Sequence, residues 1–157
     1  MHKDNYENIY AQIRGKKHFV LLPPVAAPCV NEQEVPGATY TPEPSDTDSN
    51  LQIQLDQPAE MVPVPTWDPE KPDERATAYS RFAEPMQVTL NEGDLLYLPA
   101  LWFHKVKQSC GDEHFCCAVN YWYDMEFGGS FWSTHTFIRE VGNAIIHDGG
   151  PKTLSAG

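Results

Sequence analysis

The chain has 157 residues, of which 41% are hydrophobic and 11% aromatic, enough for one domain with a sizeable core. Its formal net charge of −11 repels phosphate backbones, which argues against nucleic-acid binding as the main role. No stretch approaches the roughly 20 apolar residues of a membrane span, and the polar N-terminus does not resemble a signal peptide. We therefore expect a protein of the cytoplasm, or also of the nucleus, that binds neither nucleic acid nor membrane.

Two extended segments follow the N-terminus, at residues 8–13 and 17–22, and Gly15 lies between them. A short turn that contains glycine, placed between two such runs, predicts a β-hairpin. Pro23 and Pro24 would end the second strand, because proline cannot donate a hydrogen bond to a β-ladder.

Residues 23–72 differ in composition from the rest of the chain. Ten of the 14 prolines precede Glu70, and no lysine or arginine occurs between Lys17 and Lys71. Within this stretch, Leu51–Leu55 alternates between apolar and polar residues, which predicts a short strand. We interpret the stretch as an acidic, proline-rich insertion at the rim of a β-fold and not as a second domain.

From Met86 onward, the pattern is typical of β-structure. Short apolar or alternating runs, separated by turns rich in Gly, Asp and Asn, predict strands. These runs lie at residues 86–90, 95–99, 103–108 and 115–123. Many short strands with turns between them predict an all-β barrel or jelly roll.

A helix is predicted over residues 130–141, beginning at Ser130 and ending at Gly142 or Asn143. Its predicted apolar face carries large or β-branched side chains at helical spacing. These are Phe131, Thr134, Phe137, Ile138 and Val141. This face could pack on the protein's own barrel or pair two subunits, and the pattern does not distinguish the two.

Three residues have the types and the spacing of a metal-ligand set. His2 and Asp4 are two residues apart, so on a strand their side chains point to the same face. Together with the distant His104 they would supply two imidazoles and one carboxylate, the facial set of non-haem Fe(II) oxygenases. Alone, an His-x-Asp pair is weak evidence, because such pairs often occur by chance.

The surroundings of His104 strengthen the case. The run NEGDLLYLPALWFH at residues 91–104 resembles the distal-histidine segment of Jumonji-C hydroxylases. Residues 4–10, 15–19 and 118–125 extend the similarity to the Jumonji-C branch known as the bifunctional peptidase and lysyl hydroxylase. The resemblance covers about residues 2–140.

The resemblance implies a double-stranded β-helix, a cupin-like jelly roll with a C-terminal helix, over residues 1–141, and a tail over residues 142–157. It implies Fe(II) and the co-substrate 2-oxoglutarate, and makes His2, Asp4 and His104 the iron ligands.

The resemblance also assigns co-substrate contacts. Lys17 would pair with the far carboxylate of 2-oxoglutarate. Asn8 and Asn120 match asparagines that line the pocket in related hydroxylases, although each could also be a structural amide at the end of a strand.

The activity implied is hydroxylation of a lysine in a protein substrate, such as a translation-associated GTP-binding protein; a peptidase activity has also been proposed for the family. A cationic substrate suits acidic residues near the mouth of the site. Asp112, Glu113, Asp124 and Glu126 are candidates by charge alone. A homodimer through the C-terminal helix is also expected from the family.

Relatives have a long segment before the His-x-Asp motif, which provides early strands. We therefore expect the chain to be the C-terminal part of the domain, without its N-terminal strands. The alternative to an active hydroxylase is a non-catalytic cupin-like interaction module, or a truncated inactive remnant. Iron-dependent decarboxylation of 2-oxoglutarate separates these possibilities.

Overall fold

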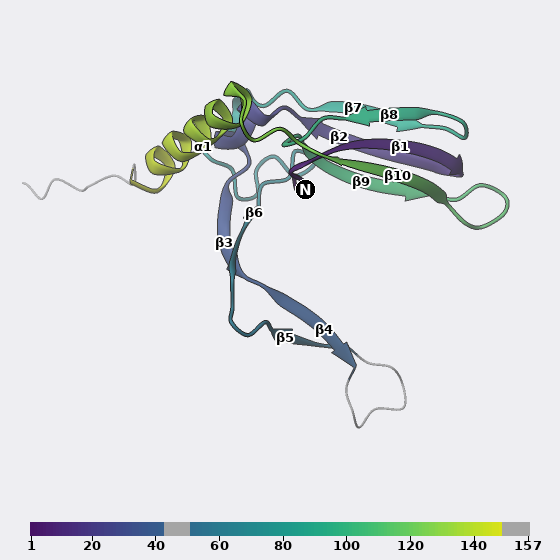
Figure 1. Cartoon of the computed structure of the whole chain (residues 1–157), viewed down its shortest axis with the longest axis horizontal. Helices are drawn as coiled ribbons and strands as arrows, with labels where there is room; N and C mark the ends of the chain where they lie inside the picture. The colour runs from purple at the N-terminus through teal and green to yellow at the C-terminus, as the bar shows by residue number, and fades with distance from the viewer. Residues whose placement is uncertain (43–50, 149–157) are drawn as a thin grey trace, which may run out of the picture.

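The computed structural model describes residues 1–42 and 51–148, which form two packed β-sheets, a protruding ribbon and a C-terminal helix (Figure 1). One sheet has the strand order β10-β1-β8 and the other has the order β7-β2-β9, and every pairing is antiparallel. The strands are β1 (Tyr6–Arg14), β2 (Lys16–Leu22), β7 (Met86–Leu90), β8 (Leu95–Leu98), β9 (Phe103–Ser109) and β10 (Cys117–Asp124). The predicted strands in these regions are confirmed.

The core lies between the two sheets. Tyr10 on β1 and Leu98 on β8 pack with Phe19, Leu21 and Leu90 of the opposite sheet. Alternate residues of a strand point to opposite faces, so each strand contributes every second side chain to this layer. The predicted all-β jelly roll with a C-terminal helix is therefore confirmed.

The predicted hairpin at residues 8–22 is wrong, because β1 and β2 belong to different sheets. Gly15, at φ +69°, turns the chain from one sheet to the other, and its N–H donates to the Glu92 carboxylate at 3.0 Å. A Cβ at this position would lie 2.7 Å from the carbonyl oxygen of Ser109. A glycine turn that joins two strands of one hairpin and a glycine turn that joins strands of two different sheets have the same local sequence pattern. Which of the two forms depends on the strands with which β1 and β2 pair, and residues 86–124 supply these strands.

A two-stranded ribbon, here called the arm, extends away from the sheets (Figure 1). At its base β3 (Glu32–Pro36) pairs with β6 (Met61–Pro65), and further out β4 (Ala38–Pro42) pairs with β5 (Leu51–Leu55). The strand predicted at Leu51–Leu55 is confirmed. The extent of the domain and of its insertion stays a prediction.

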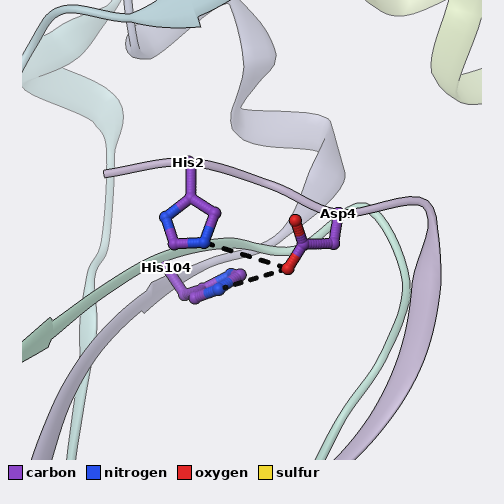
Figure 2. A group of neighbouring side chains, drawn as sticks. All are labelled: His2, Asp4 and His104. Carbon is purple, nitrogen blue, oxygen red and sulfur yellow. Dashed lines mark ion pairs between the residues drawn. The ribbon is translucent and has the colours of Figure 1, made fainter. Parts of the chain in front are cut away.

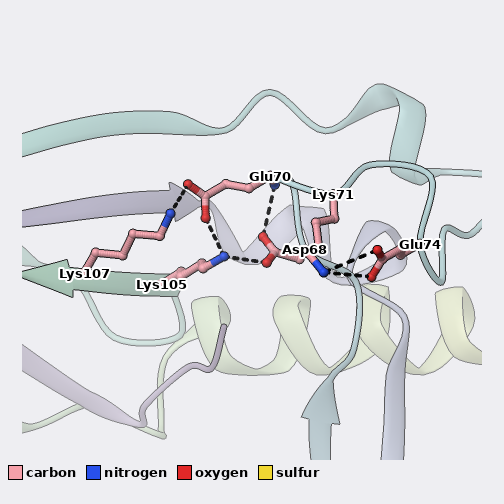
Figure 3. Close-up of polar contacts among 6 residues, drawn as sticks. All are labelled: Asp68, Glu70, Lys71, Glu74, Lys105 and Lys107. Atoms are coloured by element: carbon pink, nitrogen blue, oxygen red, sulfur yellow. Dashed lines mark hydrogen bonds and ion pairs between the residues drawn. The ribbon is translucent and has the colours of Figure 1, made fainter.

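The chain returns from the arm along the β7-β2-β9 sheet, where ion pairs hold it (Figure 3). Lys105 of β9 pairs with Asp68 at 2.5 Å and also with Glu70. Lys107, on the same face of the strand, lies 2.6 Å from Glu70. These carboxylates therefore fasten the return segment to the outer face of β9.

The helix α1 (Ser130–Asp148) is longer than predicted and passes through Gly142. A Cβ on Gly142 would lie 2.6 Å from Cγ of Pro28, in the short 3-10 helix η1 (Pro24–Cys29). The glycine therefore permits close packing of the two helices and does not end α1. A second 3-10 turn, η2 (Ser80–Phe82), lies near η1.

The face of α1 that the sequence marks as apolar is largely exposed, including Phe131 and Phe137. His135 and Gly142 lie on the buried side instead. The homodimer through this helix stays a prediction, which sedimentation of the purified chain would check. Among the described residues, no helix combines the length and the apolar character needed to cross a membrane.

Candidate metal centre

The N-terminal segment lies antiparallel to the start of β9. The His2 N–H donates to the carbonyl of His104 at 3.0 Å, and the His104 N–H donates to the carbonyl of His2 at 2.7 Å. The Leu101 N–H donates to the carbonyl of Asp4 at 2.8 Å, which extends the contact. Directly paired residues present their side chains on the same face, and the two imidazole centroids are 4.1 Å apart.

Asp4 completes a three-residue group (Figure 2). Its Oδ2 is 3.8 Å from Nε2 of His2 and 3.7 Å from Nε2 of His104. The ligating atoms of the three residues all lie within 4.8 Å of one another. Ligands bonded at about 2.1 Å to an octahedral metal stand roughly 3 Å apart on one face, so small rotations would close the set.

The buried imidazole of His104 has the tautomer that a metal ligand needs. Its side chain is 2% exposed, and its Nδ1 is 3.0 Å from the carbonyl oxygen of Trp102. A carbonyl only accepts, so Nδ1 carries the proton and Nε2 carries a lone pair. Burial lowers the pKa of His104, which keeps the ring neutral near pH 7.

Nε2 of His104 has no hydrogen-bond partner among the residues that the structure describes. A buried acceptor left unpaired costs about 1–3 kcal/mol, so a ligand at this atom would remove a penalty. His2 and Asp4 are more exposed, which leaves space for further ligands on their side. The donor set and the unpaired nitrogen therefore both fit a divalent transition metal such as Fe(II).

A cavity of about 530 Å³ opens beside the candidate ligands. Tyr6, Asp124 and Phe127 line it on the side of the sheets, and Val62–Pro65 of β6 line it on the side of the arm. Of the four acidic residues proposed from charge, Asp124 lines this cavity, whereas Asp112, Glu113 and Glu126 do not. The arm and the sheets thus share the walls of the candidate site.

Lys17 lies on β2 in the same alternating set as Phe19 and Leu21, which face the core. Leu21 is paired with His104, so Lys17 lies four residues, or about 13 Å, further along the inner face. Its Nζ is 3.3 Å from Oε1 of Gln108. It does not line the cavity, and its contact with a co-substrate stays a prediction.

Asn8 is 2% exposed, and neither polar atom of its amide has a hydrogen-bond partner in the described part of the chain. Asn120 is exposed on β10, opposite Tyr10, and therefore shares the inner side of this sheet with Asn8. Unpaired buried amide atoms are costly, so Asn8 fits a polar ligand in the core. The structure does not bring Asn120 into the cavity, and both roles stay predictions.

Sequence reasoning missed two buried polar groups, one on the inner face of β1 and one beside the candidate ligands. Gln12 is 1% exposed, and its Oε1 lacks a partner among the described residues. Its spacing of two from Tyr10 was a signal that could have placed it on the inner face. The ion pair of Lys3 with Glu32 joins residues 29 apart, and no local pattern indicates it.

The sequence matches the cupin-like domain family over residues 1–129. It is 40% identical over 133 residues to lysine-specific demethylase JMJ32 of Arabidopsis thaliana, covering 80% of this chain and 38% of that protein. It is 41% identical over 128 residues to the bifunctional peptidase and (3S)-lysyl hydroxylase JMJD7 of Homo sapiens, covering 81% of this chain and 38% of that protein. It is 34% identical over 141 residues to JmjC domain-containing protein E of Dictyostelium discoideum, covering 82% of this chain and 39% of that protein.

The chain spans about two fifths of the length of these relatives. The matched region contains the three candidate ligands and every strand of the described part of the chain. The resemblance inferred from the motifs is confirmed, and the chain belongs to the cupin-like family of JmjC proteins.

Proposed function

We propose that the chain carries the metal site of an Fe(II)- and 2-oxoglutarate-dependent hydroxylase that acts on a lysine side chain of a protein. The observation that carries the proposal is the meeting of His2, Asp4 and His104, in which the unpaired Nε2 of a buried imidazole lies 3.7 Å from a carboxylate oxygen. JmjC relatives are 2-oxoglutarate oxygenases, which supports the class of reaction. One relative is named a lysyl hydroxylase, which supports the choice of residue.

Bound Fe(II) would supply the activation of O₂, with 2-oxoglutarate oxidised to succinate and carbon dioxide. The protein's part is to hold and orient the ligands. The carbonyl of Trp102 fixes the ring of His104, and the backbone pairing of His2 with His104 sets the two imidazoles side by side. The carboxylate of Asp4 offsets part of the charge of a dication.

The remaining predicted residues would bind the co-substrate and the substrate. Lys17 carries an ammonium on the inner face of β2 and suits a carboxylate, while the unpaired amide of Asn8 suits an oxygen atom. Asp124, on the cavity wall, would attract the ammonium of a substrate lysine. Apolar side chains of β6, such as Val62, would contact its methylene groups.

The test is titration of Mn(II), a redox-silent substitute for iron, into the purified chain with 2-oxoglutarate present. We expect one site, with affinity at least about 100-fold lower in His104→Ala and in Asp4→Asn. Asp4 is partly exposed, so its variant controls for misfolding. His18→Ala, a histidine bonded to Thr89 and Ser109 on the outer face of β2, should bind as the unchanged chain does.

Turnover then separates the proposed hydroxylase from its alternatives. With Fe(II), 2-oxoglutarate, O₂ and a translation-associated GTP-binding protein as first substrate, we expect succinate, carbon dioxide and a lysine that gains one oxygen atom, seen by mass spectrometry. Formaldehyde release from a methyl-lysine peptide would instead indicate demethylation, the activity in the name of the Arabidopsis relative. A folded chain that binds no metal and forms no succinate would favour the non-catalytic interaction module.

A further inference from the structure

Lys3, the residue between the two N-terminal candidate ligands, is held on both sides. Its side chain is 13% exposed, and its ammonium pairs with the carboxylate of Glu32. Its Nζ also lies 5.2 Å from the ring centroid of Phe103, the fully buried neighbour of His104. A lysine side chain is usually exposed to solvent, so this degree of contact calls for an explanation.

Glu32 is the first residue of β3, at the base of the arm, and its side chain is 1% exposed. Its two carboxylate oxygens accept from Lys3 and from Nε of Arg139 on α1. A buried carboxylate is costly unless it is paired and hydrogen-bonded, and here two cations satisfy it. Glu32 thus joins the ligand segment, the arm and the helix, although the three are far apart in the sequence.

The backbone contacts of the ligand segment leave a role for this side chain. Hydrogen bonds with His104 and Leu101 hold the main chain of His2 and Asp4 on one edge. The side chains of His2 and Asp4 are 59% and 33% exposed, so without a nearby anchor they lose conformational freedom when they bind a metal. The pair of Lys3 with Glu32 fixes the residue that both ligands flank, and therefore restricts both ligands before the metal arrives.

We propose that Glu32 is a positioning residue of the metal site, which holds His2 and Asp4 in ligating geometry through Lys3 and links the site to α1 through Arg139. The inference rests on the proposed function, since it requires that the site bind a metal. Glu32 does not touch the metal; it acts by ordering the residues that do.

The experiment measures Mn(II) affinity by electron paramagnetic resonance in the full 157-residue chain, with circular dichroism as a check of folding. We expect Glu32→Gln and Lys3→Met each to weaken Mn(II) binding about tenfold, the lower end of the range for supporting residues of metal sites. Because both act through one contact, the double variant should bind no more weakly than the weaker single variant.

Glu34→Gln is the matched control. Glu34 lies two residues further on β3, approaches the same Arg139 at 4.0 Å, and is 57% exposed. It should bind Mn(II) as the unchanged chain does. If Glu32 served only to fasten the arm to α1, Glu32→Gln would lower the unfolding midpoint and leave the Mn(II) affinity of the folded chain unaltered, which would overturn the inference.

Three further outcomes keep the test decisive. Should Glu32→Gln fail to fold, Lys3→Met still leaves Glu32 paired with Arg139, and unchanged Mn(II) affinity in that variant would refute the positioning role. If the unchanged chain binds no Mn(II), the proposed function fails, and the inference fails with it. A third result would overturn the inference alone. In that case the unchanged chain binds Mn(II) and Asp4→Asn abolishes the binding, but Glu32→Gln does not weaken it.

Discussion

Two strands with nearly the same local pattern end in opposite environments. Leu51–Leu55, with the sequence LQIQL, and Met86–Leu90, with the sequence MQVTL, both alternate apolar and polar residues. Every residue of the first strand is exposed in the arm, whereas Leu90 of the second is 4% exposed in the core. Alternation therefore specifies a strand, but a second layer is needed to bury its apolar face.

The same contrast separates the two regions energetically. Strands of the stacked sheets bury side chains such as Phe19 and Leu21, and burial stabilises by about 25 cal/mol per Å² of apolar surface. In the arm, Tyr40 and Ile53 face each other across the ribbon and remain 67% and 68% exposed. We conclude that the stacked sheets supply the stability, while the base of the arm supplies a wall of the candidate site.

The largest expected effect comes from comparing one leucine substitution in the stacked sheets with one in the arm. Leu21→Ala, at a buried position of β2 in the layer between the sheets, should lower the free energy of unfolding by about 2–5 kcal/mol, because it leaves a cavity in the core. Leu55→Ala, at a position of β5 that is 51% exposed, should cost less than about 0.5 kcal/mol. Urea denaturation followed by circular dichroism measures both. A similar loss at Leu55 would show that the arm is covered in solution.

A second substitution tests whether the packing of α1 contributes to the free energy of unfolding, as the stacked sheets do, or contributes little, as the arm does. Gly142→Ala would gain up to about 1 kcal/mol from helix propensity. It would also force a Cβ to within 2.6 Å of Pro28, and overpacking typically costs about 1–3 kcal/mol. We expect a net loss of about 1–2 kcal/mol in thermal denaturation.

Gly129→Ala serves as its control, since a Cβ there meets no heavy atom within 4 Å. A stabilised Gly142→Ala variant would mean that α1 detaches readily from η1.

The smallest expected effect concerns the ion pairs that tie the return of the arm to β9. Hydrogen bonds from Lys105 and Lys107 hold the pKa of Glu70 below its ordinary value of 4.5. A carboxyl group with a lowered pKa stabilises the folded state above its ordinary value, and that contribution disappears as the pH falls through the lowered value. Glu70→Gln should therefore lower the unfolding midpoint slightly at pH 7, and the difference should vanish in acid.

Unfolding midpoints of both chains from pH 7 down to about pH 3 test this expectation. Glu60→Gln removes a carboxylate of the arm that forms no ion pair within the described residues, and it should leave the unfolding midpoint at pH 7 unchanged. A Glu70 variant that is equally destabilised at every pH would instead point to lost packing.

The sequence by itself located the strands of the two stacked sheets and the residues of the candidate ligand set, but it did not indicate β3, β4 and β6 of the arm. Alternation is a local property, so the strands of residues 86–124 could be located without knowing their partners. The motif at residues 91–104 identified His104, and the pair of His2 with Asp4 followed from its spacing of two.

Tertiary structure alone decided which strands pair, which structural roles Gly15 and Gly142 have, and how the segment that carries His2 and Asp4 is anchored. Gly15 reads as a hairpin turn until β1 and β2 find different partners. Gly142 reads as a helix end until Pro28 packs against it. Glu32 carries no local signal, because its partners Lys3 and Arg139 lie 29 and 107 residues away. Such contacts depend on which surfaces pack together, and local periodicity does not encode that choice.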